Sequence, residues 1–238
     1  MRRSLSCIIG AQLWLAVSSV VAFAADPLAS GYQVKSPYMR VYGVTPPPYG
    51  HVDFCRRSPE ECQPGDDRGE RLPGNREQLA ELGRVNRQVN AEITPMTDME
   101  QYGVEDYWTV PASGKGDCED YALLKRQRLM GVGWPASALL MTVVFDEKNE
   151  GHAILMARTV HGDMILDNKN DDLKFWYEAP YHYVMRESFV DPRVWMTLDP
   201  DTATPTIAVA GNRKPPGVDE VPACRPRSGW CAVTVKNP

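Results

Sequence analysis

The 238-residue sequence lacks three features that define whole classes of protein. It has no basic excess: 26 Lys and Arg face 31 Asp and Glu, and a pI near 5.4 argues against a nucleic-acid-binding surface. Beyond the first 25 residues it has no apolar run of the ~20 residues that span a bilayer, and it has no internal repeat. The 43% apolar content favours one ordinary globular domain with appendages.

The first 25 residues contain the three parts of a secretory signal. Two arginines precede a mostly apolar run over 5–23, and Ala-Phe-Ala at 22–24 has the small-x-small pattern of a cleavage site. The alternative is a single membrane anchor, but serine and glutamine residues interrupt the run. Cys7 lies near the start of the run and not at its end, which argues against a lipoprotein. We therefore expect a signal peptide over 1–25 and an exported, soluble mature protein.

In an exported protein we expect most cysteines to form disulfides, because the compartment outside the cytoplasm is oxidising. Five cysteines follow residue 25, so at least one has no partner within the chain. Six residues separate Cys55 from Cys62, and six separate Cys224 from Cys231, each couple in polar, Pro-rich sequence. Among the several connectivities we predict these two local disulfides, which leave Cys118 free.

Proline and glycine divide the rest of the chain into three segments. Residues 26–75 are rich in Pro, Gly and charge, and they predict an extended arm with little regular structure. Residues 76–198 carry the apolar periodicities of a folded domain. Residues 199–238 form a Pro-rich tail that contains the predicted Cys224–Cys231 loop. We therefore expect the core and the site within 76–198.

Two helices are predicted in this domain. Apolar residues recur at three- and four-residue steps over 79–93, which is typical of one helical face, and Pro95 ends the pattern. A second helix is predicted from Asp117 to about Met130, with Asp117 as N-cap and Asp120 completing a variant of the capping box. Residues 98–116 predict a loop.

Antiparallel strands follow the helices. Short apolar or alternating runs predict strands over 139–145, 152–160, 163–166 and 181–190, with a tight hairpin connection at His161–Gly162. Helices followed by a run of strands indicate an α+β domain.

The segment Gly-Lys-Gly-Asp-Cys-Glu-Asp-Tyr at 114–121 concentrates the candidate chemistry. Cys118 is expected in the first turn of the second helix, where free N–H groups and the helix dipole favour the thiolate. Asp117, Glu119 and Asp120 oppose this by raising the pKa of the thiol, so a base or a bound cation would assist. The alternative is an inert buried cysteine, which the Gly-rich turn and the adjacent acids disfavour.

Two residues of the predicted hairpin can serve that thiol. His152 begins one strand and Asp167 closes the next, so antiparallel pairing brings both toward the same end of the ladder. A carboxylate there would hold the imidazole tautomer while the imidazole takes the thiol proton. The alternatives are a histidine bonded to backbone and a simple Asp-Asn turn. A zinc site of Cys118, His152 and His182 lacks any typical ligand spacing.

Together these blocks resemble the bacterial transglutaminase-like cysteine proteinases. The resemblance rests on Val-Asn at 85–86 and 89–90, Trp108, Gly-Asp-Cys-Glu-Asp-Tyr at 116–121, Gly-His-Ala at 151–153 and Leu-Asp-Asn at 166–168. It implies a papain-like or transglutaminase-like core, with the nucleophile at a helix N-terminus packed on an antiparallel sheet that carries His and Asp. By this resemblance Cys118 is the nucleophile, His152 the base and Asp167 its orienting carboxylate.

The same resemblance implies a substrate, partners and a metal. The LapG-type members of the family release surface adhesins in the periplasm, so we expect a periplasmic enzyme, a protein substrate such as an adhesin, and a membrane-bound regulator. That branch binds calcium at acids beside the cysteine, which correspond to Asp117, Glu119 and Asp120. Such oxygen ligands suit Ca²⁺. No organic cofactor is expected.

Three functions stay open at this level. The leading one is hydrolysis of a peptide or isopeptide bond through a thioester acyl-enzyme. Transfer of the acyl group to an amine, as in transglutaminases, would use the same residues. The third is an exported binding protein that keeps the fold without catalysis, which loss of a triad member would favour; all three members are present.

Overall fold

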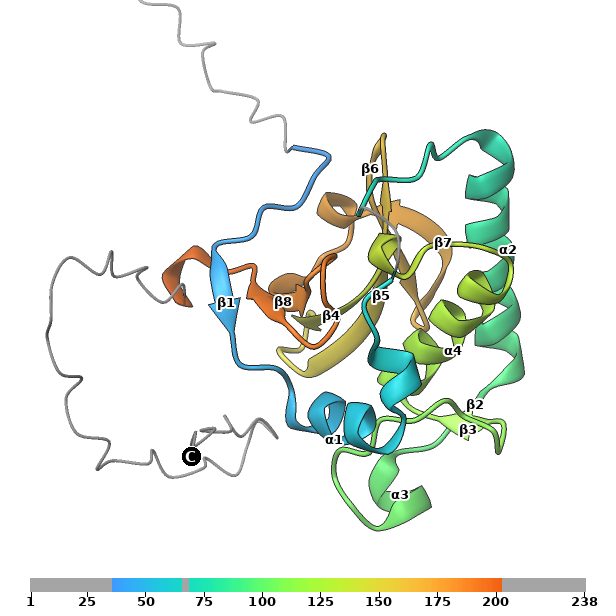
Figure 1. Ribbon diagram of the computed structural model, residues 1–238. Helices are drawn as coiled ribbons and strands as arrows, with labels where there is room; N and C mark the ends of the chain where they lie inside the picture. The colour runs from blue at the N-terminus through green and yellow to red at the C-terminus, as the bar shows by residue number, and fades with distance from the viewer. Residues whose placement is uncertain (1–35, 66–68, 203–238) are drawn as a thin grey trace, which may run out of the picture. The chain divides into compact units, whose positions relative to one another are not determined.

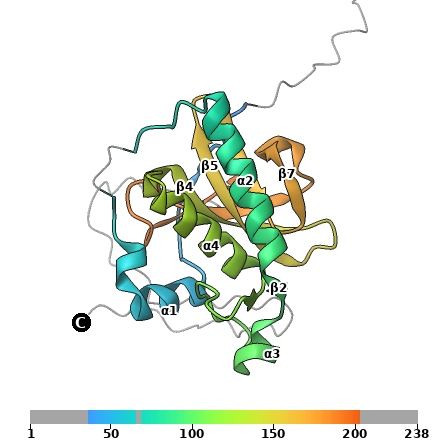
Figure 2. The same cartoon turned by 90° about the vertical axis from the view of Figure 1, so that its right-hand side faces the viewer.

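A computed structural model describes residues 36–65 and 69–202 (Figure 1). Within them, seven strands form one antiparallel sheet in the order β1-β9-β8-β4-β5-β6-β7. The two long helices, α2 (Arg76–Glu92) and α4 (Cys118–Gly131), pack on one face of this sheet (Figures 1 and 2). The predicted α+β class is confirmed. The predicted signal peptide and the Cys224–Cys231 pair lie outside the described residues.

The remaining elements are short. The sheet consists of β1 (Gly43–Thr45), β4 (Leu139–Phe145), β5 (Gly151–Thr159), β6 (Gly162–Asp167), β7 (Asn170–Phe175), β8 (His182–Glu187) and β9 (Trp195–Thr197). A separate parallel ladder joins β2 (Thr94–Pro95) and β3 (Lys115–Gly116). The shorter helices are α1 (Tyr49–Arg57) and α3 (Asp98–Tyr102), with 3₁₀ turns at Pro59–Cys62, Ala136–Ala138, Trp176–Glu178 and Pro200–Thr202. No helix of the described part of the chain has the length and apolar character needed to cross a membrane.

Helix α2 forms where the apolar periodicity predicts it. Asn75 and Gln78 build a capping box, each side chain accepting from the other's backbone N–H. Such an N-cap contributes about 1 kcal/mol. The buried stripe of Leu82, Val85 and Val89 contributes more, because each fully buried aliphatic side chain is worth roughly 1.5–3 kcal/mol.

Helix α4 begins where predicted, but the predicted capping box does not form at Asp117. Asp117 is the N-cap residue, yet its side chain makes no capping bond, and its Oδ2 accepts from the N–H of Asp98 at 3.1 Å. Asp120 Oδ1 accepts from the N–H of Thr109 at 2.9 Å. These acids therefore hold the preceding loop, because that loop brings backbone donors to the helix start.

Hydrophobic side chains are buried on both faces of the sheet. The larger cluster lies between the sheet and the helices and includes Leu82, Val89, Leu129, Met141, Leu155 and Leu166. A smaller cluster includes Met39, Val144, Ile154, Met156, Ile165 and Tyr183. The central strands β4, β5 and β6 are consequently buried along almost their whole length.

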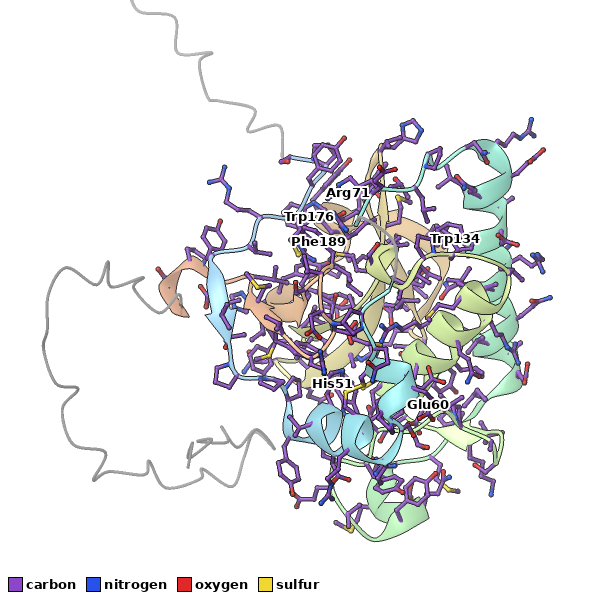
Figure 3. The ribbon with its side chains drawn as sticks, viewed as in Figure 1. His51, Glu60, Arg71, Trp134, Trp176 and Phe189 are labelled. Atoms are coloured by element: carbon purple, nitrogen blue, oxygen red, sulfur yellow. A yellow bond between two sulfur atoms is a disulfide. The ribbon has the colours of Figure 1, made fainter. Side chains whose placement is uncertain are left out.

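The expectation of little regular structure in the arm is wrong for residues 43–62. Strand β1 pairs with β9 and forms one edge of the sheet. Helix α1 buries Phe54 and His51, and the predicted Cys55–Cys62 disulfide is confirmed. His51, labelled in Figure 3, lies beside that disulfide. A helix this short has no extended apolar stripe, so its contacts with the core stabilise it.

The other elements differ less from the sequence prediction. Strands β4, β5, β6 and β8 confirm the predicted runs to within a few residues, although the hairpin turn is Val160–His161, one residue earlier than predicted. The predicted loop at 98–116 contains α3 and β3. Strands β7 and β9 were not predicted. Edge strand β7 is polar and partly exposed, so its sequence shows no buried run.

Candidate active site

Cys118 is the first residue of α4; the residue is partly exposed, and its thiol is not in a disulfide. The N–H of Ala153 on β5 donates to Sγ at 3.3 Å, and the thiol donates to Glu119 Oε2 at 3.3 Å. Burial raises the pKa of the Cys118 thiol well above its usual value, and the charge of Glu119 adds to this effect. In this arrangement the thiol is protonated and held by its neighbouring acid.

His152 and Asp167 meet across the β5–β6 hairpin. The register pairs Leu155 with Leu166, which makes positions 152 and 167 diagonal neighbours at one end of the ladder. His152 Nε2 lies 2.9 Å from Asp167 Oδ1, and both side chains are buried. Since Ala153 contacts Cys118 Sγ, the strand that carries the imidazole also contacts the thiol.

The Asp167 carboxylate has two further donors. The N–H of Lys169 donates to Oδ1 at 3.0 Å, and the hydroxyl of Tyr181 donates to Oδ2 at 2.5 Å. Burial raises the pKa of Asp167, but the bonds from His152, Tyr181 and the Lys169 N–H outweigh it and leave that pKa below its usual value. Asp167 is therefore ionised at neutral pH.

Two asparagines of α2 hold the turn that follows Asp167. Asn90 Nδ2 donates to the carbonyl of Asp167 at 2.9 Å and to Asp171 Oδ1 at 2.8 Å. Asn86 Nδ2, buried one helical turn earlier, donates to the carbonyls of Asn170 and Asp171. The paired Val-Asn steps in the sequence thus anchor the β6–β7 turn to the helix.

Acidic side chains gather on the other side of the cysteine. One carboxylate oxygen from each of Asp98, Asp117 and Glu119 lies within 4.8 Å of the others. Burial raises the pKa of Asp98 to about 6, helped by Asp117, and burial also raises the pKa of Glu119 well above its usual value. Asp117 Oδ1 is buried without a hydrogen-bond partner. Carboxylate oxygens alone, one of them unpartnered, suit a hard cation such as Ca²⁺.

The sequence predicted Asp117, Glu119 and Asp120 as metal ligands, and the structure groups the first two with Asp98 instead of Asp120. Asp120 is bound to Thr109 through Oδ1, and its buried Oδ2 has no partner. Burial raises the pKa of Asp120 to about 8. Asp98 was missed because it lies 19 residues before Asp117 and only the fold of the loop brings it there.

A cavity of about 340 Å³ opens beside the thiol. It is lined by Pro95, Met96, Thr97, Glu100, Gly116, Asp117, Cys118, Tyr121 and Asn168. The thiol is therefore accessible from the β2–β3 side. His182 is exposed, and its Nε2 lies 3.9 Å from Asp199 Oδ2. Among the described residues, no cluster of potential metal ligands includes His182, so the zinc alternative gains no support.

Comparisons with known proteins identify similar structures and one protein family. Three structures of Legionella pneumophila LapG are each 25% identical to the chain. The match to the calcium-bound structure covers 46% of this chain and 68% of that one, with a TM-score of 0.41. The matches to a second structure and to an EGTA-treated one cover 50 and 51% of this chain and 72 and 71% of those chains, both with a TM-score of 0.42. No curated protein matches. The model of the family "Bacterial transglutaminase-like cysteine proteinase BTLCP" matches residues 41–203. Because this match spans more than half of the chain, the protein belongs to the bacterial transglutaminase-like cysteine proteinases.

Proposed function

We propose that this cysteine peptidase hydrolyses a peptide bond with a Cys118–His152–Asp167 triad. The observation that carries the proposal is the bond from His152 Nε2 to Asp167 Oδ1 at 2.9 Å, combined with the contact between Cys118 Sγ and the adjacent residue Ala153. With Nε2 donating to the carboxylate, the imidazole keeps its Nδ1 lone pair for the thiol proton.

The proposed reaction follows from this tautomer. The thiol proton of Cys118 moves to His152 Nδ1, and Sγ attacks the substrate carbonyl. Backbone N–H groups at the start of α4, including that of Cys118, would stabilise the oxyanion. The imidazolium then protonates the leaving amine, which leaves a thioester. Water, deprotonated by the same imidazole, hydrolyses the thioester and frees the thiol.

We propose that the acids beside the thiol bind Ca²⁺, the ion present in one Legionella pneumophila LapG structure. Asp98, Asp117 and Glu119 would hold it, and Asp120 stays a predicted ligand through its unpartnered Oδ2. The bound ion would neutralise the acids that raise the pKa of Cys118. Without that neutralisation, the Cys118 thiol stays protonated and donates a hydrogen bond to Glu119.

The substrate we propose is an extended protein segment, such as part of a surface adhesin cleaved in the periplasm, with a membrane-bound regulator as partner. The cavity beside Cys118 supports access of a chain segment to the thiol. Membership of a peptidase family favours hydrolysis over the binding-protein alternative. Acyl transfer to an amine stays an alternative that product analysis would detect.

The test is proteolysis of surface proteins. Cells lacking this protein are incubated as spheroplasts with the purified mature chain, in Ca²⁺ or in EGTA, and released fragments are identified by their new N-termini. We expect a fragment that appears with Ca²⁺ and disappears with Cys118→Ser. A fragment produced equally by Cys118→Ser would contradict the proposal, and a product crosslinked through an amine would indicate acyl transfer.

A further inference from the structure

The carboxylate of Asp167 has a hydrogen-bond donor on each oxygen. Oδ1 accepts from His152 Nε2 and from the N–H of Lys169, and Oδ2 accepts from the hydroxyl of Tyr181. Rotation of the carboxylate about its Cβ–Cγ bond would break the Tyr181 bond and the His152 bond together. The Tyr181 hydroxyl therefore restrains the direction in which Oδ1 points.

Tyr181 also contacts the imidazole itself. Its ring lies edge-on to that of His152, with centroids 5.7 Å apart and planes at 67°. His152 is 3% exposed and Asp167 is 4% exposed, so their hydrogen bond lies in a region of low dielectric. The Tyr181 ring packs against the hydrophobic cluster that includes Ile154 and Ile165, which limits its movement.

The hydroxyl remains a donor throughout the physiological range. Burial raises the pKa of Tyr181 far above its usual value, and the bond to Asp167 adds to the effect. A protonated phenol facing an ionised carboxylate forms a charge-assisted hydrogen bond, which is stronger than a bond between neutral groups.

We propose that Tyr181 is a positioning residue of the catalytic site: its hydroxyl holds Asp167 Oδ2 so that Oδ1 stays aligned with His152, and its ring keeps water from the imidazole. This inference rests on the proposed triad. Tyr181 acts through its bond to Asp167 and the packing of its ring on His152, and it exchanges no proton or electron pair with the substrate. Its removal therefore lowers reactivity without changing which atoms react.

The chain offers a matched control two residues away. Tyr181 is partly buried, and Tyr183 is buried on β8, but the Tyr183 hydroxyl donates to the carbonyl of Trp176 at 2.7 Å. Tyr181→Phe and Tyr183→Phe thus remove the same atom from neighbouring positions, and only the first removes a bond to Asp167.

Two readouts test the proposal in the presence of Ca²⁺: the rate of Cys118 alkylation by iodoacetamide, and the ring ¹H–¹⁵N signals of His152. A hydrogen bond to a charged group is worth enough to change a rate roughly tenfold, so we expect Tyr181→Phe to slow alkylation by about that factor. We also expect it to speed solvent exchange of the His152 Nε2 proton. Tyr183→Phe should match the wild type in both readouts.

The variant Asp167→Asn separates the two proposals. If Asp167→Asn leaves alkylation unchanged, the triad itself is contradicted. If Asp167→Asn slows alkylation while Tyr181→Phe does not, the positioning role is overturned. In the Asp167→Asn background, Tyr181→Phe should have little further effect, because both act on one interaction.

A measurement on the wild type covers the case in which Tyr181→Phe fails to fold. We expect a Tyr181 hydroxyl proton protected from exchange and showing a nuclear Overhauser effect to the His152 ring. A rapidly exchanging hydroxyl would overturn the proposal.

Discussion

Each proposed catalytic side chain is restrained by residues from distant parts of the chain. Cys118 is bound by the N–H of Ala153, His152 by Asp167, and Asp167 by Tyr181 and the Lys169 N–H. The site therefore depends on these four hydrogen bonds, two of which have backbone N–H groups as donors.

The first prediction at this scale is that Cys118 is the only reactive thiol. Cys55 is bonded to Cys62, and we predict the same for the pair in the tail. Mass spectrometry after thiol labelling of the native, unreduced mature protein should find one modified cysteine, and none in Cys118→Ser. Two or more labelled positions would contradict the disulfide scheme.

The second prediction concerns Asp167→Asn. The amide would favour the wrong imidazole tautomer, and the analogous change in serine proteases costs ~10⁴ in rate. We expect a folded protein, judged by circular dichroism, with most of its proteolytic activity lost. Asp172→Asn, at an exposed acid on β7, should remain active. Nearly full activity of Asp167→Asn would show that another residue orients the His152 imidazole, and Asn168 would be the first candidate to test.

At the scale of elements, helix α4 carries the candidate nucleophile in its first turn and buried charged residues farther along. Its first turn carries the cysteine and the acids, and the helix packs against β5 and against the neighbouring helix α2 (Figure 2). Burial extends to Lys125, which is 1% exposed. Burying a charged side chain such as Lys125 in this helix costs free energy, because the charge loses its hydration.

Lys125 gives a prediction on pH and stability. Burial lowers its pKa from 10.5 to about 7, so the folded state binds fewer protons than the unfolded state between these values. This charge therefore destabilises the fold below pH 7, and the cost is relieved as pH rises toward 10.5.

Urea unfolding between pH 7 and pH 10 measures the effect. We expect Lys125→Met to be more stable than the wild type at pH 7, by an amount on the order of a few kcal/mol, and the difference to shrink as pH rises. Lys115→Met, at an exposed position, serves as the control. A difference independent of pH would show that packing, and not charge, explains the change.

The helix start also predicts calcium-dependent stability. At a hundredfold excess over Kd, a ligand that binds only the folded state stabilises it by about 2.7 kcal/mol. Titration calorimetry should give heat with Ca²⁺, and EGTA should lower the melting temperature. Asp98→Asn should abolish both effects and Asp172→Asn neither. No heat and an unchanged melting temperature at millimolar Ca²⁺ would leave these acids as structural groups only.

At the scale of the whole molecule, a buried polar network joins α1 to helix α4. Glu187 on β8 is fully buried, and its Oε1 lies 3.1 Å from His51 Nε2 and 3.2 Å from an Arg126 nitrogen. Its Oε2 accepts from the N–H of Met141. The network thus connects α1, α4, β4 and β8 at one point.

Glu187→Ala should therefore destabilise the protein strongly. Removing one partner of a buried ion pair costs roughly 3–5 kcal/mol, because the remaining charge stays buried. The control is Glu92→Ala, which removes a surface pair to Arg128 worth about 1 kcal/mol or less. Denaturant unfolding should separate the two variants clearly. Equal losses would mean that the network is solvated in solution.

The sequence by itself determined the features that depend on local spacing. Helix α2, the start of α4, the β5–β6 hairpin and the local disulfide follow from periodicity and short-range pattern. The proximity of His152 to Asp167 followed as well, because two paired antiparallel strands bring positions 152 and 167 to the same end of the ladder.

Tertiary structure alone decided the contacts between distant segments. It ordered α1 and β1 against the core, brought Asp98 to the acids at the start of α4, and set Tyr181 against Asp167. These contacts join residues 14 to more than 150 positions apart or lie in short elements without periodic pattern. Their stability comes from burial and hydrogen bonds made only in the folded state, and no local pattern in the chain encodes such pairs.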